Sequence, residues 1–383
     1  MPESTATTHT AVTALDDDVT ALDLEHLLRS LRQEFETMAG SSLLITGGAG
    51  FLGYYLVQAV LAWNRRAASP DQQIHITVYD NYMRGVPAWL TALEHEPTLT
   101  LCKYDVIKPL PGDMPDFDYI VHAAGIASPK YYRLHPLETM DANINGLRSF
   151  LEHARQRQGT ERPVRGLLFF SSSEIYGDPD PAHIPTTEDY RGYVSCTGPR
   201  ACYDESKRYG ETLCVVYAQQ YGVPVKVARP FNNYGPGLKI SDRRVIPDFA
   251  RDVLAGRPIV MLSNGKPSRT FCYSADAIAG YLKVLVRGRA GEAYNIGTES
   301  PEISMMDLAE RIVTVGRELL GYEGEVVRQA SDEKDYLVDN PQRRCPSIAK
   351  ARAELDYDPA IGLDEGLRRS LVWYHQNPHA EDA

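Results

Sequence analysis

Short apolar runs alternate with stretches of helical periodicity over residues 42–230. The apolar runs predict six β-strands, at 43–46, 74–79, 99–104, 119–122, 167–171 and 225–229. The stretches between them predict helices at about 51–63, 87–95, 136–157 and 200–221. Since strand and helix alternate, we expect right-handed crossovers and an α/β fold built on a doubly wound parallel sheet.

The spacing of apolar residues loosens after residue 230. There the pattern predicts helices at 245–255, 274–287, 304–319 and 364–376 and short strands at 258–262 and 293–296. We expect residues 231–383 to form mainly a smaller, mixed substrate-binding domain, with some elements returning to the main sheet. At the other end, residues 1–19 lack periodicity, and 22–38 predict one amphipathic helix within an extension of residues 1–41.

Composition and charge narrow the class of protein. The 383 residues carry 51 acidic and 40 basic side chains, a net charge of −11, which argues against a nucleic-acid or anionic-membrane surface. The sequence contains neither an apolar run long enough to span a bilayer nor a secretory signal. Six cysteines without a CxxC pair are typical of unpaired cytoplasmic thiols and not of a metal site. We therefore expect a cytoplasmic protein.

The first strand runs directly into a glycine-rich turn and then a helix. Gly47 allows the tight turn, Gly50 allows a pyrophosphate to approach the backbone, and Gly53 allows the helix to pack on the strand. Phe51 and Leu52 complete the turn, whose helix N-terminus presents N–H groups to phosphates. This context predicts a Rossmann dinucleotide site over residues 42–230. The G-x-x-G-x-x-G spacing resembles that of the short-chain dehydrogenase/reductase superfamily.

Further cofactor contacts are expected where the next strands end. Asp80, followed by Asn81, can accept from both ribose hydroxyls and would repel a 2′-phosphate, which favours NAD over NADP. Arg84 could weaken that preference, stack on adenine or reach a phosphate. The resemblance implies that Asp105 and Val106 lie near the adenine and that Ala124 passes under the nicotinamide ribose.

The strongest chemical signal is the YxxxK spacing of Tyr203 and Lys207 on a predicted helix. A spacing of four places the phenol and the ammonium on one helix face. A nearby Lys⁺ and the nicotinamide would lower the phenol pKa from about 10 toward working pH. Ser172, after the fifth predicted strand, supplies a second hydroxyl.

Longer motifs resemble the UDP-glucuronate decarboxylases (UDP-xylose synthases). They are YDESKRYGET from Tyr203, preceded by Gly-Pro-Arg, SSSEIYGDP from Ser171, DRRV from Asp242 and SRTF from Ser268, and the similarity covers about residues 42–376. The resemblance implies that NAD⁺ oxidises sugar C4, that Tyr203 takes the hydroxyl proton with help from Ser172, and that Lys207 holds the nicotinamide ribose. The 4-keto group then makes a C5 carboxylate a β-keto acid, which loses CO₂.

The pair after Ser172 bears on which reaction follows. The 4,6-dehydratases carry Asp-Glu there, whereas this chain has Ser173 and Glu174. A serine is a poor acid for expelling hydroxide, so dehydration loses its catalyst. The pair matches the decarboxylase pattern, and Ser173 and Glu174 join the catalytic candidates. A 4-epimerase or atypical 4,6-dehydratase acting on a nucleotide sugar remains the alternative, and a non-catalytic NAD-binding relative is a third.

The resemblance also implies substrate contacts. Arg269 matches an arginine near the sugar carboxylate and, with Glu174, is expected to touch the sugar. Glu138 and Asp141 stand where typical decarboxylases carry lysines, which leaves the sugar and the base open. A homodimer through a bundle of the helices near 136–157 and 200–221 is expected. The other substrate-contact candidates are Tyr132, Asn143, Asn232, Arg244 and Arg344.

Overall fold

The computed structural model describes residues 14–329 and 338–378. Its centre is a parallel sheet of seven strands in the order β11-β6-β5-β4-β1-β2-β3. The order reverses at β1, which pairs with β2 on one side and β4 on the other. The strands are β1 (Ser42–Thr46), β2 (His75–Asp80), β3 (Leu99–Lys103), β4 (Tyr119–His122), β5 (Gly166–Phe170), β6 (Val225–Pro230) and β11 (Ala293–Ile296).

Both faces of this sheet are buried, which is why its strands read as apolar runs. Every residue of β4 and β5 is buried. Along β1, Leu43 and Ile45 belong to one core cluster and Leu44 to another, because successive side chains point to opposite faces. The six predicted strands are present. The strand predicted at 293–296 joins the sheet as its edge, with Ala293 opposite Val227.

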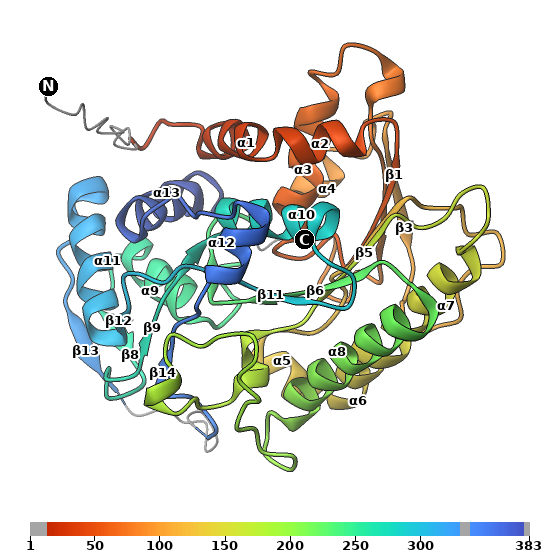
Figure 1. The fold of residues 1–383 in the computed structure, drawn as a ribbon. Coiled ribbons are helices and arrows are strands. Elements are labelled where there is room, and N and C mark those ends of the chain that lie inside the picture. The colour runs from red at the N-terminus through yellow and green to blue at the C-terminus, as the bar shows by residue number, and fades with distance from the viewer. Residues whose placement is uncertain (1–13, 330–337, 379–383) are drawn as a thin grey trace, which may run out of the picture.

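Helices cover the two faces as separate layers (Figure 1). One layer holds α3 (Gly53–Asn64) and α10 (Ser274–Arg287), which pack on each other and on α1 (Val19–Ser30). The opposite layer holds α6 (Pro136–Asp141), α7 (Leu147–Arg157) and α8 (Ala201–Tyr221). This three-layer arrangement is the predicted doubly wound fold.

Three predicted helices differ in detail. The helix predicted at 22–38 bends at Leu31 into α1 and α2 (Arg32–Met38). The one predicted at 87–95 is reduced to α4 (Ala88–Thr91). After it, the backbone N–H groups of Leu93 and Glu94 donate to carbonyls three residues earlier, as in a 3₁₀-helix. The one predicted at 136–157 contains a π-helical turn at 142–146, where Gly146 fits against Val106. Such turns often occur at functional sites.

The segment after β6 adds small sheets and four further helices. Its short strands are β7 (Asn233–Tyr234), β8 (Ile259–Met261), β9 (Ser268–Arg269), β10 (Cys272–Tyr273), β12 (Ile303–Ser304), β13 (Val326–Arg328) and β14 (Arg343–Arg344). Its remaining helices are α9 (Val245–Leu254), α11 (Met305–Leu320), α12 (Ala349–Leu355) and α13 (Leu363–Gln376). β9 lies between β12 and β14. In the parallel β9–β14 pair, Arg269 is the partner of Arg344.

The N-terminal helices lie across both parts of the molecule, above α3 and beside α13 in Figure 1. Asp23 of α1 is fully buried, accepts from the hydroxyls of Tyr55 and Tyr273, and pairs with Arg369 of α13 at 2.6 Å. The extension is therefore part of the core. The sequence predicts an irregular start over residues 1–19. Residues 1–13 of this segment lie outside the described residues, and α1 begins at Val19. No described helix has the length and apolar character needed to cross a membrane.

Candidate active site

A cavity of about 1000 Å³ opens at the carboxyl ends of the parallel strands, beside the reversal of strand order at β1. Ligands of open α/β sheets bind at this place. The volume lies at the upper end of the range for small-molecule sites, which suits two adjoining ligands. All the candidate site residues line this cavity except Asn143.

The glycine turn forms the floor of the cofactor side. Gly47 has φ +72°, and a Cβ there would lie 2.7 Å from the Cα of Ala124. A Cβ on Gly53 would overlap the carbonyl oxygen of Gly48, so helix and turn pack backbone to backbone. At Gly50 a side chain would fill the cradle beside the carbonyl of Gly47, 3.1 Å away. These glycines fit the approach of a dinucleotide pyrophosphate.

Asp80 ends β2 at the edge of this turn. Its Oδ2 accepts from the backbone N–H of Ala49 at 3.0 Å and its Oδ1 from that of Tyr82 at 2.8 Å. Burial raises the pKa of this carboxyl. The fixed carboxylate fits a ribose, and the neighbouring candidates that line the same wall are Phe51, Leu52, Asn81, Arg84, Asp105, Val106 and Ala124.

Tyr203 stands where the cofactor side meets the rest of the cavity. Its ring stacks on Tyr132 with centroids 5.0 Å apart. Burial raises the phenol pKa to about 12, while a hydrogen bond with Ser172 lowers it. In the chain without its cofactor, desolvation of the phenolate outweighs the favourable contacts. The lowering expected from Lys207 together with the nicotinamide stays a prediction.

Lys207 is fixed by the backbone of β5. Its Nζ donates to the carbonyl of Phe170 at 2.7 Å and lies 5.6 Å from the centroid of the Tyr203 ring. Burial lowers its pKa to about 7. The one-face placement predicted from the spacing of four is present, and the ammonium is bonded to the end of β5.

Glu174 lies in a short helical turn after β5 and is held by arginines. Arg344 forms a bidentate pair with it, with Nη2 2.8 Å from Oε2, and Arg200 pairs with the same carboxylate. The guanidinium groups of Arg200, Arg344 and Arg269 hold the pKa of Glu174 far below its usual range, against the effect of burial. The three arginines thus favour the ionised form of Glu174.

Arg269 and Arg344 reach the cavity together because their strands pair in register. Arg269 donates to the carbonyl oxygens of Ser268 and Gln342 at 2.7 and 3.2 Å. Burial and the nearby Arg344 lower its pKa to about 9. The positive charge on this wall is therefore held in place by backbone oxygens.

The remaining substrate candidates divide into lining and supporting residues. Asn232 adopts φ +40° and donates to the carbonyl of Thr270 at 2.9 Å, and Tyr132 lines the cavity. Asn143 is fully buried outside the lining, where its amide donates to Ser206 at 2.9 Å. The Oδ1 of Asn143 lies behind Gly125, which lines the cavity, and has no hydrogen-bond partner among the described residues. Its expected substrate contact stays a prediction.

Sequence reasoning missed three charged residues of this site. Arg200 precedes α8 and grips Glu174, yet its Gly-Pro-Arg context served only as a family motif. Asp204, next to Tyr203, is buried, and burial together with Glu174 raises its pKa to about 7. Asp242 pairs with Arg84 and Arg244. The available signal for the two carboxylates was position: Asp204 directly follows Tyr203, and Asp242 lies two residues before Arg244.

The chain is similar to known proteins over most of its length. Residues 43–297 match the model of the NAD dependent epimerase/dehydratase family. The chain is 34% identical to UDP-glucuronic acid decarboxylase 1 of Xenopus tropicalis, over 92% of this chain and 78% of that protein. It is 35% identical to UDP-glucuronic acid decarboxylase 6 of Arabidopsis thaliana, over 85% of this chain and 86% of that protein.

Solved structures resemble the whole fold. One is the Streptomyces venezuelae dTDP-glucose 4,6-dehydratase DesIV with NAD and TYD bound, with a TM-score of 0.73 and 26% identity over 88% of this chain and 97% of that one. Another is the epimerase Mth375 of Methanothermobacter thermautotrophicus, with a TM-score of 0.75 and 24% identity over 93% and 98% of the two chains. The second likeness concerns the fold alone.

Proposed function

The chain belongs to the NAD dependent epimerase/dehydratase family, and we propose that it decarboxylates a UDP-linked uronic acid with NAD as its cofactor. The reaction is of the UDP-glucuronate to UDP-xylose type, through a 4-keto intermediate. Relatives named UDP-glucuronic acid decarboxylases align with most of the chain. The observation that carries the proposal is the arginine cluster around Glu174, next to Tyr203.

The cluster holds more positive than negative charge. Arg200, Arg269 and Arg344 surround one ionised carboxylate, and Arg269 and Arg344 are buried. Asp204 offsets part of this charge only when it is ionised, and its pKa is about 7. Buried charges require partners, so this wall favours an anionic substrate. A uronic acid brings a carboxylate in addition to its diphosphate, whereas a neutral hexose brings the diphosphate alone.

The remaining residues have matching roles. Bound NAD⁺ supplies the hydride acceptor. In the proposed reaction Tyr203, which is hydrogen-bonded with Ser172, takes the proton of the sugar hydroxyl, and Lys207, which lines the same cavity, holds the nicotinamide ribose. Arg269 and Arg344 orient the carboxylate that leaves as CO₂. Glu174 holds the guanidinium of Arg344, and backbone carbonyl oxygens hold that of Arg269.

Incubation of the full chain with UDP-glucuronate and NAD⁺, followed by mass analysis of the sugar nucleotide, tests this proposal. We expect loss of CO₂. An unchanged mass with a new stereoisomer would select the 4-epimerase instead, and loss of water would select a dehydratase. UDP-glucose, which lacks the carboxylate, is the control, and the same preparation should release no CO₂ from it.

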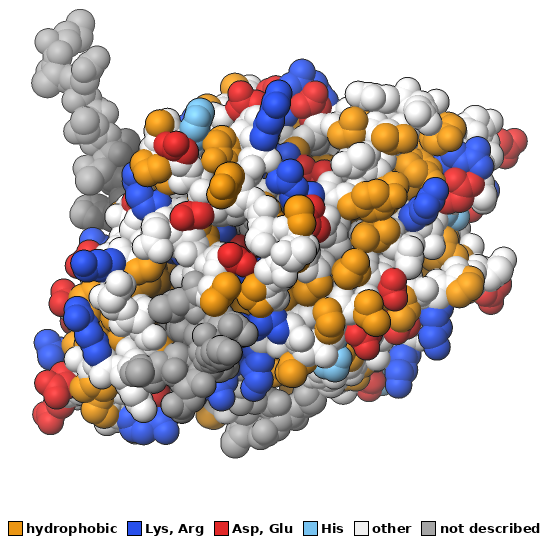
Figure 2. All heavy atoms as spheres, turned by 90° about the horizontal axis from the view of Figure 1, so that it is seen from below, with side chains coloured by type: hydrophobic (Ala, Val, Ile, Leu, Met, Phe, Trp, Pro, Cys, Tyr) orange, Lys and Arg blue, Asp and Glu red, His pale blue; other side chains and the backbone are white. Residues whose placement is uncertain are grey.

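We also propose a homodimer through the face formed by α6 and α8. Leu137 of α6 and Tyr209 of α8 are 71% and 46% exposed there, and Leu134, the last residue of the preceding helix α5 (Pro129–Leu134), is 63% exposed. Figure 2, which views the side on which α6 and α8 lie in Figure 1, shows hydrophobic side chains gathered among charged ones. Sedimentation should give a dimer for the natural chain and a monomer for Leu137→Glu.

Two further expectations complete the proposal. The six cysteines are free, which supports a reducing, cytoplasmic location. Residues 42–230 supply the cofactor domain and 231–383 mainly the substrate domain, with β11 and α10 packed on the first.

A further inference from the structure

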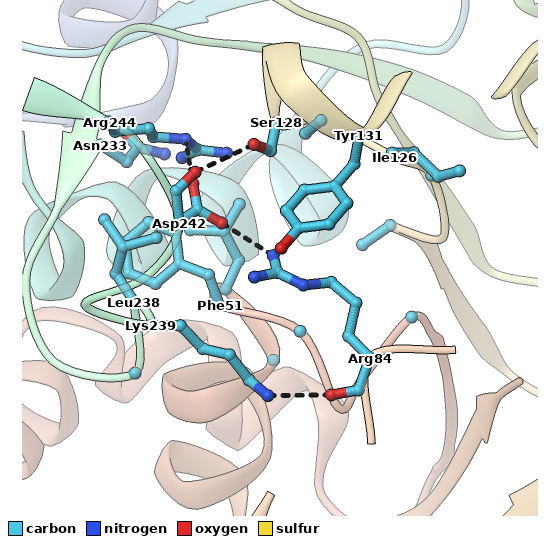
Figure 3. A pocket seen from close by; sticks show the side chains of 18 of the residues that line it. Phe51, Arg84, Ile126, Ser128, Tyr131, Asn233, Leu238, Lys239, Asp242 and Arg244 are labelled. Atoms are coloured by element: carbon cyan, nitrogen blue, oxygen red, sulfur yellow. Dashed lines mark hydrogen bonds and ion pairs between the residues drawn. The ribbon is translucent and has the colours of Figure 1, made fainter. Parts of the chain in front are cut away.

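Asp242 is a buried carboxylate between two arginines at the cavity wall (Figure 3). Its Oδ2 lies 2.8 Å from Nη1 of Arg84, and its Oδ1 lies 2.9 Å from Nε of Arg244. Arg84 belongs to the loop after β2, the strand that ends at Asp80. Arg244 is the N-cap residue of α9 in the substrate part. We call these three side chains the Asp242 bridge.

Other contacts connect the bridge to the segment after β4 and to Lys239, which lies shortly before Asp242. Ser128 donates through its hydroxyl to the backbone carbonyl of Asp242 at 3.0 Å. The guanidinium of Arg84 lies 4.5 Å from the centroid of the Tyr131 ring, and Lys239 donates to the carbonyl of Arg84 at 2.8 Å. Figure 3 shows these groups meeting between the loops after β2 and β4 and the segment before α9. The bridge therefore joins the cofactor wall to the substrate wall.

The ion pairing within the bridge would change when a nucleoside diphosphate binds. Asp242 divides one negative charge between two guanidinium groups. A diphosphate at Arg244 would compete for that guanidinium and place more negative charge near Asp242. With Arg244 paired to the diphosphate, the Asp242 carboxylate can align with Arg84 alone, and since Asp242 is only 4% exposed this pair is less screened than one in open water. The loop that carries Arg84 would then be held more firmly beside Asp80.

We propose that the Asp242 bridge couples the two ligand sites, so that a nucleoside diphosphate bound at Arg244 tightens the hold on the dinucleotide through Arg84. The proposal rests on the proposed function, in which both ligands occupy this cavity. Thermodynamic linkage requires the converse as well: the dinucleotide must tighten binding of the nucleoside diphosphate by the same factor.

Fluorescence titration of the full chain with NADH, without and with saturating UDP, tests the coupling. We expect UDP to lower the NADH Kd by at least about 5-fold, the lower end of ordinary coupling between sites. In Arg84→Met this factor should fall below about 2-fold, and Arg84→Lys should keep part of it because an ammonium can still pair with Asp242. The matched control is Arg157→Met, since Arg157 pairs with Asp116 at 2.6 Å, is partly buried and does not line the cavity.

The outcomes separate the coupling from the function. The coupling is overturned if UDP leaves the NADH Kd of the natural chain unchanged, or if Arg84→Met keeps the full factor. It is also overturned if Arg157→Met loses the factor as Arg84→Met does. Failure of the proposed function shows differently, as a natural chain that binds NADH and UDP with coupling yet releases no CO₂ from UDP-glucuronate.

Discussion

The two walls of the cavity are held together by different kinds of interaction. The cofactor wall is made by the backbone: the glycine turn packs on main-chain atoms, and Asp80 is fixed by two N–H groups. The substrate wall is made by charged side chains, in which Glu174 depends on Arg200 and Arg344. A site built from backbone contacts keeps its shape when one side-chain charge is removed. A network of buried ion pairs does not, because the partner of the removed charge is left unpaired. The predictions below test this difference between the walls, from the largest expected effect to the smallest.

The largest effect is expected where the walls meet, at Tyr203. Tyr203→Phe should lower turnover by roughly 10²- to 10⁴-fold, the usual scale for one acid–base group. NADH affinity should stay within about 2-fold, because the phenol oxygen does not support the glycine turn. Steady-state kinetics and NADH titration provide the two measurements. Tyr209→Phe, on the same helix with an exposed ring, is the control, and near-normal turnover of Tyr203→Phe would remove Tyr203 from catalysis.

Removal of one arginine should damage the substrate wall selectively. Arg344→Met removes both hydrogen bonds of the bidentate pair and leaves Glu174 paired with Arg200 alone. We expect kcat/KM for the nucleotide sugar to fall by roughly 10- to 100-fold, since a broken buried ion pair is costly. The NADH Kd should not change. Arg343→Met is a matched control because Arg343 is adjacent but half-exposed and pairs with Glu302. Equal losses in the two variants would contradict a specific role for Arg344.

A smaller effect is expected on the cofactor wall from Asp80→Asn. The amide keeps the size of the carboxylate but loses the charge, and hydrogen bonds to charged groups contribute about 1.5–3 kcal/mol. We expect the NADH Kd to rise by roughly 10-fold and that of NADPH to fall, because the repulsion of a 2′-phosphate is lost. UDP affinity is the internal control for the other wall. Unchanged discrimination between NADH and NADPH would exclude Asp80 from the ribose site.

The walls also differ in how far sequence alone could predict them. The cofactor wall follows from neighbouring residues, since strand, turn and helix fall within residues 42–64. The substrate wall depends on pairing between segments far apart, such as the register that sets Arg269 beside Arg344. Residue patterns cannot give that register, and they did not show that Arg200 would reach Glu174. The raised pKa of Tyr203 escaped prediction for the same reason, because burial is a property of the assembled fold.

The smallest effect is expected from Asp204 of the substrate wall, as a dependence of folding stability on pH. The carboxylate is buried beside Tyr203, with Oδ2 3.8 Å from Nε of Arg200 and Oδ1 without a hydrogen-bond partner among the described residues. Burial and Glu174 raise its pKa to about 7 from an ordinary value of 3.8. Since the folded chain binds this proton more tightly than the unfolded chain does, the stability that it contributes is fully present below pH 3.8 and is lost as the pH rises to about 7.

Asp204→Asn stays neutral throughout and should remove this loss. The difference in Tm between Asp204→Asn and the natural chain should therefore rise between pH 5 and pH 8, by roughly 1–1.5 °C for each kcal/mol involved. Thermal unfolding across that range provides the measurement. Glu205→Gln, on the next residue and partly exposed, should show no such trend. A constant difference in Tm for Asp204→Asn would mean that Asp204 is ionised at every pH tested, and the substrate wall would then carry less excess positive charge than its arginines suggest.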